Sequence, residues 1–343
     1  MSRKKPVFGV NVNNREPLIA PSYTLDNLLE LSEIVEEVGF DSVWVGDSLF
    51  SKPRFEPMML MAALSQRTKR VKLGTSCLVT ATRNPLYLAL EWATLDQMSN
   101  GRTILGACMG SPEEGVRREY AALGLPFKKR ASLFEEGLAV LQELWTNGVT
   151  NFQGEHFNYD NVSFYSGTEM EPLKPIQSPP PIWVVSNPRL VRGKKAEQET
   201  EQIISRAAHR IAKYGHGWMT CCRAAYPDEF KEQKAQIVSA IREIDRNPDD
   251  YVMSYQVTMN IADSREEAQR GISDYIGEYY PELSRKMDIS QWGPVGTPDD
   301  IIDWLKTFYE SGVDYFICRF GSLDQFGQVE RFAKEVLPVF NTE

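Results

Sequence analysis

Short runs of β-branched and aromatic residues recur along the chain at nearly even spacing, with helix-like segments between them. There are eight such runs: Val7–Val12, Ser42–Val45, Val71–Ser76, Thr103–Cys108, Ile182–Ser186, Gly217–Thr220, Tyr251–Ile261 and Val313–Cys318. Most neighbouring runs begin 29 to 35 residues apart, close to the roughly 31 residues per unit of a (β/α)₈ barrel. An open, doubly wound sheet rarely needs eight regular units. The sequence therefore predicts an α/β fold, a single (β/α)₈ (TIM) barrel domain over residues 1–343.

Two gaps between the runs are about twice as long as the others, and we interpret each as a normal unit plus an insertion. After the fourth run we expect a charged loop over residues 110–130, a helix over Ala131–Trp145 and a β-hairpin within residues 147–180. After the seventh run we expect an insertion over residues 263–294 that contains a helix. Insertions after barrel strands often form lids over a site.

Capping residues indicate where several helices begin and end. Asn84-Pro85 and Thr297-Pro298 each combine a capping side chain with a proline suited to the first helical position. An apolar stripe at three- and four-residue steps ends at Gly39, a residue type that favours the position after a helix. These signals place helices between the predicted strands.

Composition excludes several classes of partner. The formal charge is −9 and there is no long basic run, which argues against nucleic acids and anionic membranes as partners. The N-terminal segment lacks the apolar stretch of a secretory signal, and no apolar run approaches 18 residues. We therefore expect a cytoplasmic protein. The five cysteines form no CxxC pair and the three histidines show no metal-binding spacing, so we expect no metal site.

The ends of the predicted strands carry polar, sulfur-bearing and aromatic residues but few acids and bases. Paired carboxylates for glycoside hydrolysis, a Schiff-base lysine and a Ser/His/Asp set are all missing there. In barrels of this kind the active site lies at these strand ends. A site poor in protein acids and bases indicates that a cofactor carries the chemistry.

Several segments resemble the bacterial luciferase-like flavin-dependent oxidoreductases: DSVWVGDS, RVKLGTSCLVTATRNPLYLALEWATLDQMSNGRTILGACMG, LWTNGVTNFQGEHF, PPIWVVSN and GTPDDIIDWL. The resemblance extends from about Val7 to Pro338, and Arg70–Gly110 is its most specific part. It implies a (β/α)₈ barrel that binds FMN or the related 5-deazaflavin coenzyme F420 at the carboxyl ends of the strands. Family members are often homodimers, and we expect the same here.

The resemblance also implies site residues. Strand two of the family usually ends in an acid followed by histidine, and here Asp47 keeps the acid while Ser48 replaces the histidine. Asp47 is accordingly predicted to be catalytic and to face the cofactor or substrate, with a cap on the following turn as the alternative. Relatives carry a bulge with a non-proline cis peptide against the flavin ring where this chain has Ser76-Cys77. Both residues are thus expected to bind the cofactor.

The end of strand four resembles the position of a reactive cysteine beside the flavin. Cys108 is accordingly predicted to be catalytic and to touch the cofactor, with a buried inert thiol as the alternative. Its neighbours Met109 and Gly110 are expected to border the cofactor as well. Met109 replaces an arginine that often binds the FMN phosphate.

A turn after the fifth strand resembles the family's phosphate-binding turn. Ser186, Asn187 and Arg189 are its predicted phosphate ligands, with a solvated loop as the alternative. Trp218 is expected to pack in the barrel interior or on the cofactor floor, and His216 to be structural.

Three functions remain open at this stage. The first is a monooxygenase that uses reduced FMN and oxygen on a small organic substrate, with a separate flavin reductase as partner because no nicotinamide fingerprint is present. The alternative is a dehydrogenase or reductase that depends on the deazaflavin coenzyme F420 and transfers hydride. The third is a flavin-binding protein without catalysis. The first is our main prediction.

Overall fold

The computed structural model describes residues 4–20, 22–165, 170–187, 196–221, 226–279 and 293–341. Its strands are β1 (Val7–Asn11), β2 (Ser42–Val45), β3 (Lys72–Thr75), β4 (Leu78–Val79), β5 (Thr103–Cys108), β6 (Val149–Thr150), β7 (Val162–Ser163), β8 (Ile182–Val185), β9 (Gly217–Cys221), β10 (Val252–Ile261), β11 (Val295–Gly296) and β12 (Tyr315–Phe320). Its α-helices are α1 (Glu16–Ile19), α2 (Leu25–Glu37), α3 (Pro57–Arg67), α4 (Pro85–Ser99), α5 (Glu114–Ala122), α6 (Arg130–Asn147), α7 (Ala196–Tyr214), α8 (Pro227–Glu243), α9 (Arg265–Tyr279), α11 (Pro298–Ser311), α12 (Gln325–Glu335) and α13 (Leu337–Asn341).

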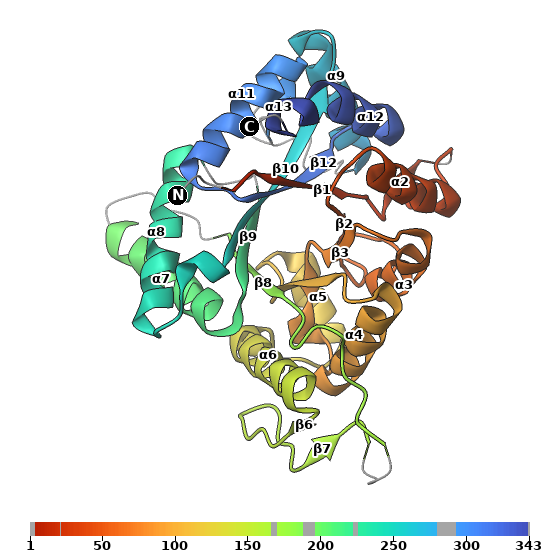
Figure 1. Cartoon of the computed structure of the whole chain (residues 1–343). Helices are drawn as coiled ribbons and strands as arrows, with labels where there is room; N and C mark the ends of the chain where they lie inside the picture. The colour runs from red at the N-terminus through yellow and green to blue at the C-terminus, as the bar shows by residue number, and fades with distance from the viewer. Residues whose placement is uncertain are drawn as a thin grey trace.

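The main sheet closes into a barrel of parallel strands. Its order is β1-β2-β3-β5-β8-β9-β10-β12, and β12 pairs again with β1. Helices surround this ring (Figure 1). The eight strands are those that the sequence predicts, because each predicted run is rich in the residue types that favour strands. The (β/α)₈ prediction is confirmed.

The predicted helix ends are confirmed as well. The side chains of Asn84 and Thr297 cap α4 and α11, each followed by a proline. Thr297 and Asp300 form a reciprocal capping box. Gly39 follows α2 with a φ of 102°, a backbone conformation that glycine adopts without strain.

Both insertions contain structure of their own. The predicted hairpin is present as the antiparallel pair β6 and β7, with a further bridge between Gln153 and Asn158. The charged loop predicted over residues 110–130 is wrong, because most of it folds into α5 and a short 3₁₀ helix. Val116 and Tyr120 lie one helical turn apart and face inward in α5. This spacing of apolar residues could have predicted the helix. In the second insertion the predicted helix is α9, and residues 280–292 lie outside the described residues.

Aromatic side chains fill the barrel interior below the strand ends. Trp44 stacks on Trp183 with ring centroids 5.0 Å apart, and Tyr315 meets Trp183 edge-on at 4.9 Å. The tyrosine hydroxyl and the Trp44 indole N–H both donate to the Ser42 hydroxyl, each over 2.6 Å. Gly74 makes room for this layer, since a Cβ there would lie 2.2 Å from a Trp44 ring carbon. The barrel is therefore a packed core with a closed floor.

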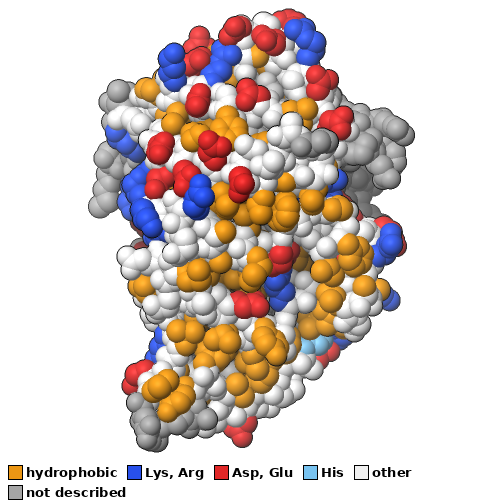
Figure 2. All heavy atoms as spheres, turned by 90° about the vertical axis from the view of Figure 1, so that its right-hand side faces the viewer, with side chains coloured by type: hydrophobic (Ala, Val, Ile, Leu, Met, Phe, Trp, Pro, Cys, Tyr) orange, Lys and Arg blue, Asp and Glu red, His pale blue; other side chains and the backbone are white. Residues whose placement is uncertain are grey.

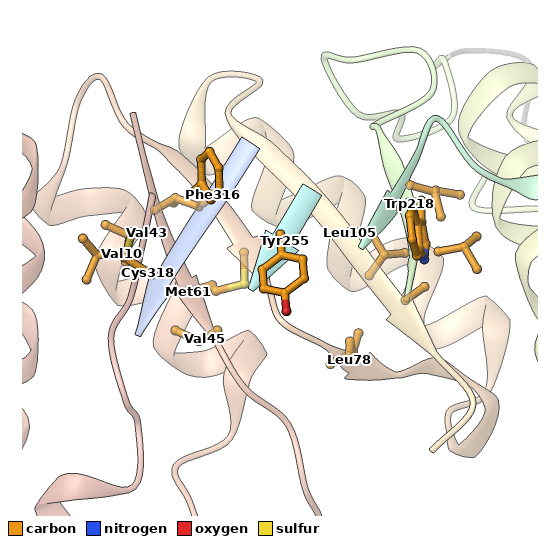
Figure 3. Packing of buried hydrophobic residues seen from close by; sticks show 14 of the residues in the cluster. Val10, Val43, Val45, Met61, Leu78, Leu105, Trp218, Tyr255, Phe316 and Cys318 are labelled. Carbon is orange, nitrogen blue, oxygen red and sulfur yellow. The ribbon is translucent and has the colours of Figure 1, made fainter. Parts of the chain in front are cut away.

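The larger core lies between the barrel and its helices. Figure 3 shows part of it, including Val10, Leu105, Trp218, Phe316 and Cys318. Each is 0% exposed, and burial of such side chains is the main favourable term in folding. Among the described residues no helix is both long and apolar enough to cross a membrane.

Candidate active site

A cavity of about 310 Å³ lies at the carboxyl ends of the barrel strands. Its volume is at the lower end of the range for pockets that bind small molecules and cofactors. From the strands and their ends come Asn11, Asn13, Gly46, Asp47, Ser76, Cys77, Cys108, Gly110, Asn187, Gln256, Thr258 and Arg319. From helices and loops come Ser48, Ser51, Lys52, Arg54, Glu113, Glu119 and Tyr279. The cavity therefore lies where the fold predicts an active site.

Asp47 combines a place in the cavity wall with a structural role. Its Oδ2 accepts the Val79 backbone N–H over 2.9 Å, and its Oδ1 accepts from the Arg83 guanidinium over 3.2 Å. Arg83 also pairs with Glu56 at 3.1 Å. Asp47 thus connects the end of β2 to β4 through a hydrogen bond. A structural role and a position facing the cavity are therefore compatible for this residue. A carboxylate oxygen accepts two hydrogen bonds, so each oxygen keeps one acceptor position.

A buried carboxylate from α5 organises the loop after β2. One oxygen of Glu119 accepts from the Ser48 hydroxyl and from the backbone N–H groups of Phe50 and Ser51, at 3.0, 2.9 and 2.7 Å. Ser48, which replaces the family's usual histidine, therefore helps to hold this loop. The same loop carries the cavity cations Lys52 and Arg54.

The end of strand three has the predicted bulge. The Ser76–Cys77 peptide is cis, as predicted, and the strand resumes after it as β4. The Cys77 thiol donates to the Cys108 sulfur across 2.8 Å. This hydrogen bond, together with burial, raises the pKa of Cys77 well above its usual value. Cys77 and Cys108 thus form a contact pair in the cavity wall.

Basic side chains, acidic side chains and an unpaired amide all line the cavity, where Lys52 pairs with Glu113 over 3.5 Å. Lys52, Arg54 and Arg319 all line it. The Arg319 guanidinium donates to the Thr258 hydroxyl over 2.9 Å, which fixes its direction. The Asn13 amide nitrogen is buried without a hydrogen-bond partner, and a bound acceptor would remove the cost of leaving this donor unpaired.

The predicted phosphate turn is described only in part. Asn187 lines the cavity, and its side-chain oxygen accepts from the Thr220 hydroxyl and the Cys221 N–H at 2.9 and 2.8 Å. Ser186 is not among the lining residues; its backbone bonds to Met219 and to the Trp218 indole. Arg189 lies outside the described residues.

Three other predicted positions lie away from the cavity. Trp218 is 0% exposed and stacks on Phe230 of α8 at 5.0 Å, so its placement in the barrel interior or on the cofactor floor is wrong. Met109 packs on the outer core, while its carbonyl accepts from Tyr120. Burial lowers the pKa of His216, whose Nδ1 accepts the Ile182 N–H, as expected of a structural histidine.

Sequence reasoning missed several lining residues, among them Lys52, Arg54, Glu119, Gln256 and Tyr279. Gln256 lies inside a strand, where only the inward alternation of side chains could have identified it. The basic segment after the second strand was a readable signal for Lys52 and Arg54. Glu119 reaches the cavity from α5, a helix that the sequence analysis did not predict.

The sequence profile of the luciferase-like monooxygenase family matches residues 7–191, more than half of the chain. This protein belongs to the luciferase-like monooxygenase family. It is therefore an enzyme, an oxidoreductase of that family, as the sequence resemblance predicted.

Relatives of this family member include two named F420-dependent glucose-6-phosphate dehydrogenases. That of Amycolatopsis mediterranei is 29% identical over 91% of this chain and 93% of its own length. The enzyme of Beutenbergia cavernae is 27% identical over 93% of this chain and 94% of its own length. A solved F420-dependent secondary alcohol dehydrogenase in complex with an F420-acetone adduct has a TM-score of 0.78 and 21% identity over 98% of this chain and 99% of its own. Monooxygenase RslO1 from Streptomyces bottropensis has a TM-score of 0.77 and 19% identity over 97% and 99%. The two structures support the barrel fold.

Proposed function

We propose that this protein is a dehydrogenase that uses the deazaflavin coenzyme F420 as hydride acceptor and oxidises a small hydroxyl compound. The observation that carries the proposal is the near full-length similarity to relatives named F420-dependent glucose-6-phosphate dehydrogenases. These relatives favour the deazaflavin alternative over the FMN monooxygenase that was our main prediction from the sequence. A separate flavin reductase belonged to that prediction and is not part of this proposal.

The residues of the cavity fit such a coenzyme. The wall offers the unpaired Asn13 amide and the Ser76–Cys77 bulge, with Cys108 beside it. We assign Ser76, Cys77, Cys108 and Gly110 to the ring end of the coenzyme, and Asn187 to its tail. The chemistry that the coenzyme supplies when bound is hydride transfer at its ring.

The basic residues support an anionic substrate. Lys52 and Arg54 come from the loop that Glu119 holds in place, and Arg319 comes from the end of β12. Charge-assisted hydrogen bonds from such groups are stronger than neutral ones. A phosphorylated sugar is therefore our proposed substrate class, in line with the names of the relatives.

Titration of the purified apo-protein with oxidised F420 and with FMN tests the coenzyme. We expect F420 to bind at least about tenfold more tightly, a difference of about 1.4 kcal/mol or more. Addition of glucose 6-phosphate to the F420 complex should then bleach the visible absorbance of the oxidised coenzyme, whereas glucose should not. Tight binding of FMN without measurable binding of F420 would reverse the assignment.

We propose Asp47 as the group that accepts the substrate's hydroxyl proton, because its two oxygens keep free acceptor positions in the cavity wall. Asp47→Asn keeps the shape of the side chain and removes the base. We expect kcat to fall by about 100-fold, the lower end of what a general base contributes, with little change in the Kd of F420. Steady-state assays of F420 reduction and coenzyme titration measure the two.

Glu56→Gln is the matched control for this variant. Glu56 is the other acidic partner of Arg83 and does not line the cavity, so we expect its kcat to stay within about twofold of wild type. If Asp47→Asn keeps half of the wild-type kcat, Asp47 is not the base.

We also propose that two copies of the chain associate. Figure 2 shows hydrophobic patches on the side of the molecule that carries α3 and α4. Among the large hydrophobic residues exposed on these helices are Met59, Tyr87, Leu90 and Met98, with Met59 and Tyr87 each 71% exposed. Exposed apolar groups of this kind often mark a protein–protein contact, and sedimentation analysis of the purified protein tests it.

A further inference from the structure

The contact between Cys77 and Cys108 is built by the pairing of two neighbouring strands. β4 runs parallel to β5 in the register Leu78↔Ala107 and Val79↔Cys108. Cys77 immediately precedes β4 and Cys108 ends β5, and both residues line the cavity. Their sulfur atoms are 2.8 Å apart, whereas the sulfurs of a disulfide are about 2.05 Å apart. A shift of less than about 1 Å separates the contact from a covalent bond.

The surroundings make these two thiols reachable by small molecules. Both line the cavity, where Cys77 is half-buried and Cys108 is 9% exposed. Cys318, by contrast, is 0% exposed in the core. Cys221 also lines the cavity, but its sulfur accepts a hydrogen bond from the Asn187 amide over 2.9 Å. A small oxidant that enters the cavity therefore meets the 77–108 pair as two adjacent thiols.

We propose that Cys77 and Cys108 are a dithiol pair that hydrogen peroxide converts into a reversible disulfide in the wall of the cofactor cavity. Cys108, whose sulfur accepts the Cys77 S–H, attacks peroxide as its thiolate: an S–O bond forms, the O–O bond breaks, and the leaving hydroxide takes a proton to become water. The second sulfur then displaces hydroxide from the resulting sulfenic acid, which forms the S–S bond and a second water. Two thiols are oxidised by two electrons and one peroxide is reduced to two waters.

The disulfide changes the surface that the cofactor meets. It removes the S–H groups from the wall and draws the end of strand three toward β5. Because we assign both residues to the ring end of the coenzyme, oxidation is expected to weaken coenzyme binding, and a thiol reductant is expected to restore it. The disulfide itself is inferred from the contact between the two sulfur atoms and from their place in the cavity wall. It does not depend on whether the coenzyme is FMN or F420.

The experiment uses the full-length protein, reduced, desalted and treated with a small excess of hydrogen peroxide. Tryptic digestion without reductant separates the two thiols, because Cys77 lies in the peptide Leu73–Arg83 and Cys108 in Thr103–Arg117. We expect these peptides to be recovered joined, with a mass two hydrogens below their sum, and separate again after dithiothreitol. Recovery of both as free thiols, or with oxygen added and no cross-link, would overturn the proposal.

Variants control for other pairings. Cys77→Ser and Cys108→Ser should each abolish the cross-link, and in Cys77→Ser the remaining Cys108 should gain oxygen. Cys221→Ser is the matched control, because Cys221 lines the same cavity; it should keep the cross-link in full. A cross-link between the Cys77 peptide and the peptide that carries Cys221 would contradict the assignment.

Titration with F420 before and after oxidation measures the effect on binding. We expect the Kd to rise by about tenfold in the cross-linked protein and to return after dithiothreitol. An unchanged Kd would overturn the effect on binding. If F420 fails to bind even the reduced protein, the proposed coenzyme is wrong, while the mass of the joined peptides still decides the disulfide.

Discussion

Replacement of Arg102 by leucine is expected to lower the free energy of unfolding by about 4 kcal/mol. Arg102 is 8% exposed and follows the turn after α4. Its guanidinium donates to the backbone oxygens of Ser65, Thr68, Val71 and Ser99 and to the Thr68 hydroxyl, at 2.7 to 3.0 Å. Leucine would remove the guanidinium from all four backbone carbonyls, while the Thr68 hydroxyl would keep its hydrogen bond to Leu64. At the lower end of the roughly 1–3 kcal/mol that each unpaired buried group costs, four carbonyls account for the expected loss.

Urea denaturation followed by tryptophan fluorescence measures this loss. Arg102→Lys keeps the charge without the planar fork and should fall between leucine and wild type, so the series is informative even if the leucine variant fails to fold. Lys72→Met is the control, since the hydrogen bond from the Lys72 side chain to the Gly101 carbonyl is exposed; its effect should stay within about 0.5 kcal/mol. If both Arg102 variants lower the free energy of unfolding by less than about 1 kcal/mol, the hydrogen bonds of Arg102 do not stabilise the fold as expected.

Replacement of Glu16 by glutamine is expected to make the protein more stable in alkaline solution. Glu16 is 1% exposed beneath α9, where Tyr275 donates to one carboxyl oxygen over 3.2 Å and the other has no partner. Burial raises the pKa of Glu16 to about 8, despite the nearby Arg319 and Arg54. The folded protein thus holds this proton where the unfolded chain, whose carboxyl ionises near pH 4.5, has lost it.

The sign of the pH effect follows from that difference. Between pH 4.5 and 8 the folded state binds one more proton than the unfolded state. In this range Glu16 therefore lowers the free energy of unfolding by about 1.4 kcal/mol for each unit that the pH rises. Glutamine has no proton to lose. The advantage of Glu16→Gln over wild type should therefore grow by about 3 kcal/mol between pH 5.5 and 8.5.

Urea denaturation of both proteins at the two pH values gives this difference, and common effects of other groups cancel in the comparison. A parallel pH dependence of the two proteins would show that Glu16 is ionised in the folded state. Glu278→Gln serves as a control, because Glu278 also lies on α9 but its side chain is exposed. Its advantage over wild type should not change with pH.

The barrel was predictable because its signals are local. Each strand is marked by its own β-branched residues, and each helix start such as Asn84-Pro85 carries its own cap. The site was predictable only in part. Asp47, Cys77 and Cys108 follow directly from strand ends, whereas Lys52 and Glu119 reach the cavity through a loop and a helix whose paths depend on tertiary contacts.

The misplacement of Trp218 has a simple physical reason. Successive side chains of a strand point to opposite faces, and both Trp218 and Met219 are apolar, so the sequence does not reveal which one faces the barrel axis. The structure places Met219 with Trp44 and Trp183 inside the barrel and Trp218 outside, under α8.

The aromatic layer of Trp44, Trp183 and Tyr315 has a kinetic consequence. Since this layer plugs the barrel beneath the cavity, ligands must enter and leave on the side of the strands' carboxyl ends. A coenzyme ring lodged against the strand ends would then lie deeper than the substrate that covers it. For the coenzyme and substrate that we propose, the ligand against the strand ends would therefore have to bind first and leave last, which is a compulsory binding order.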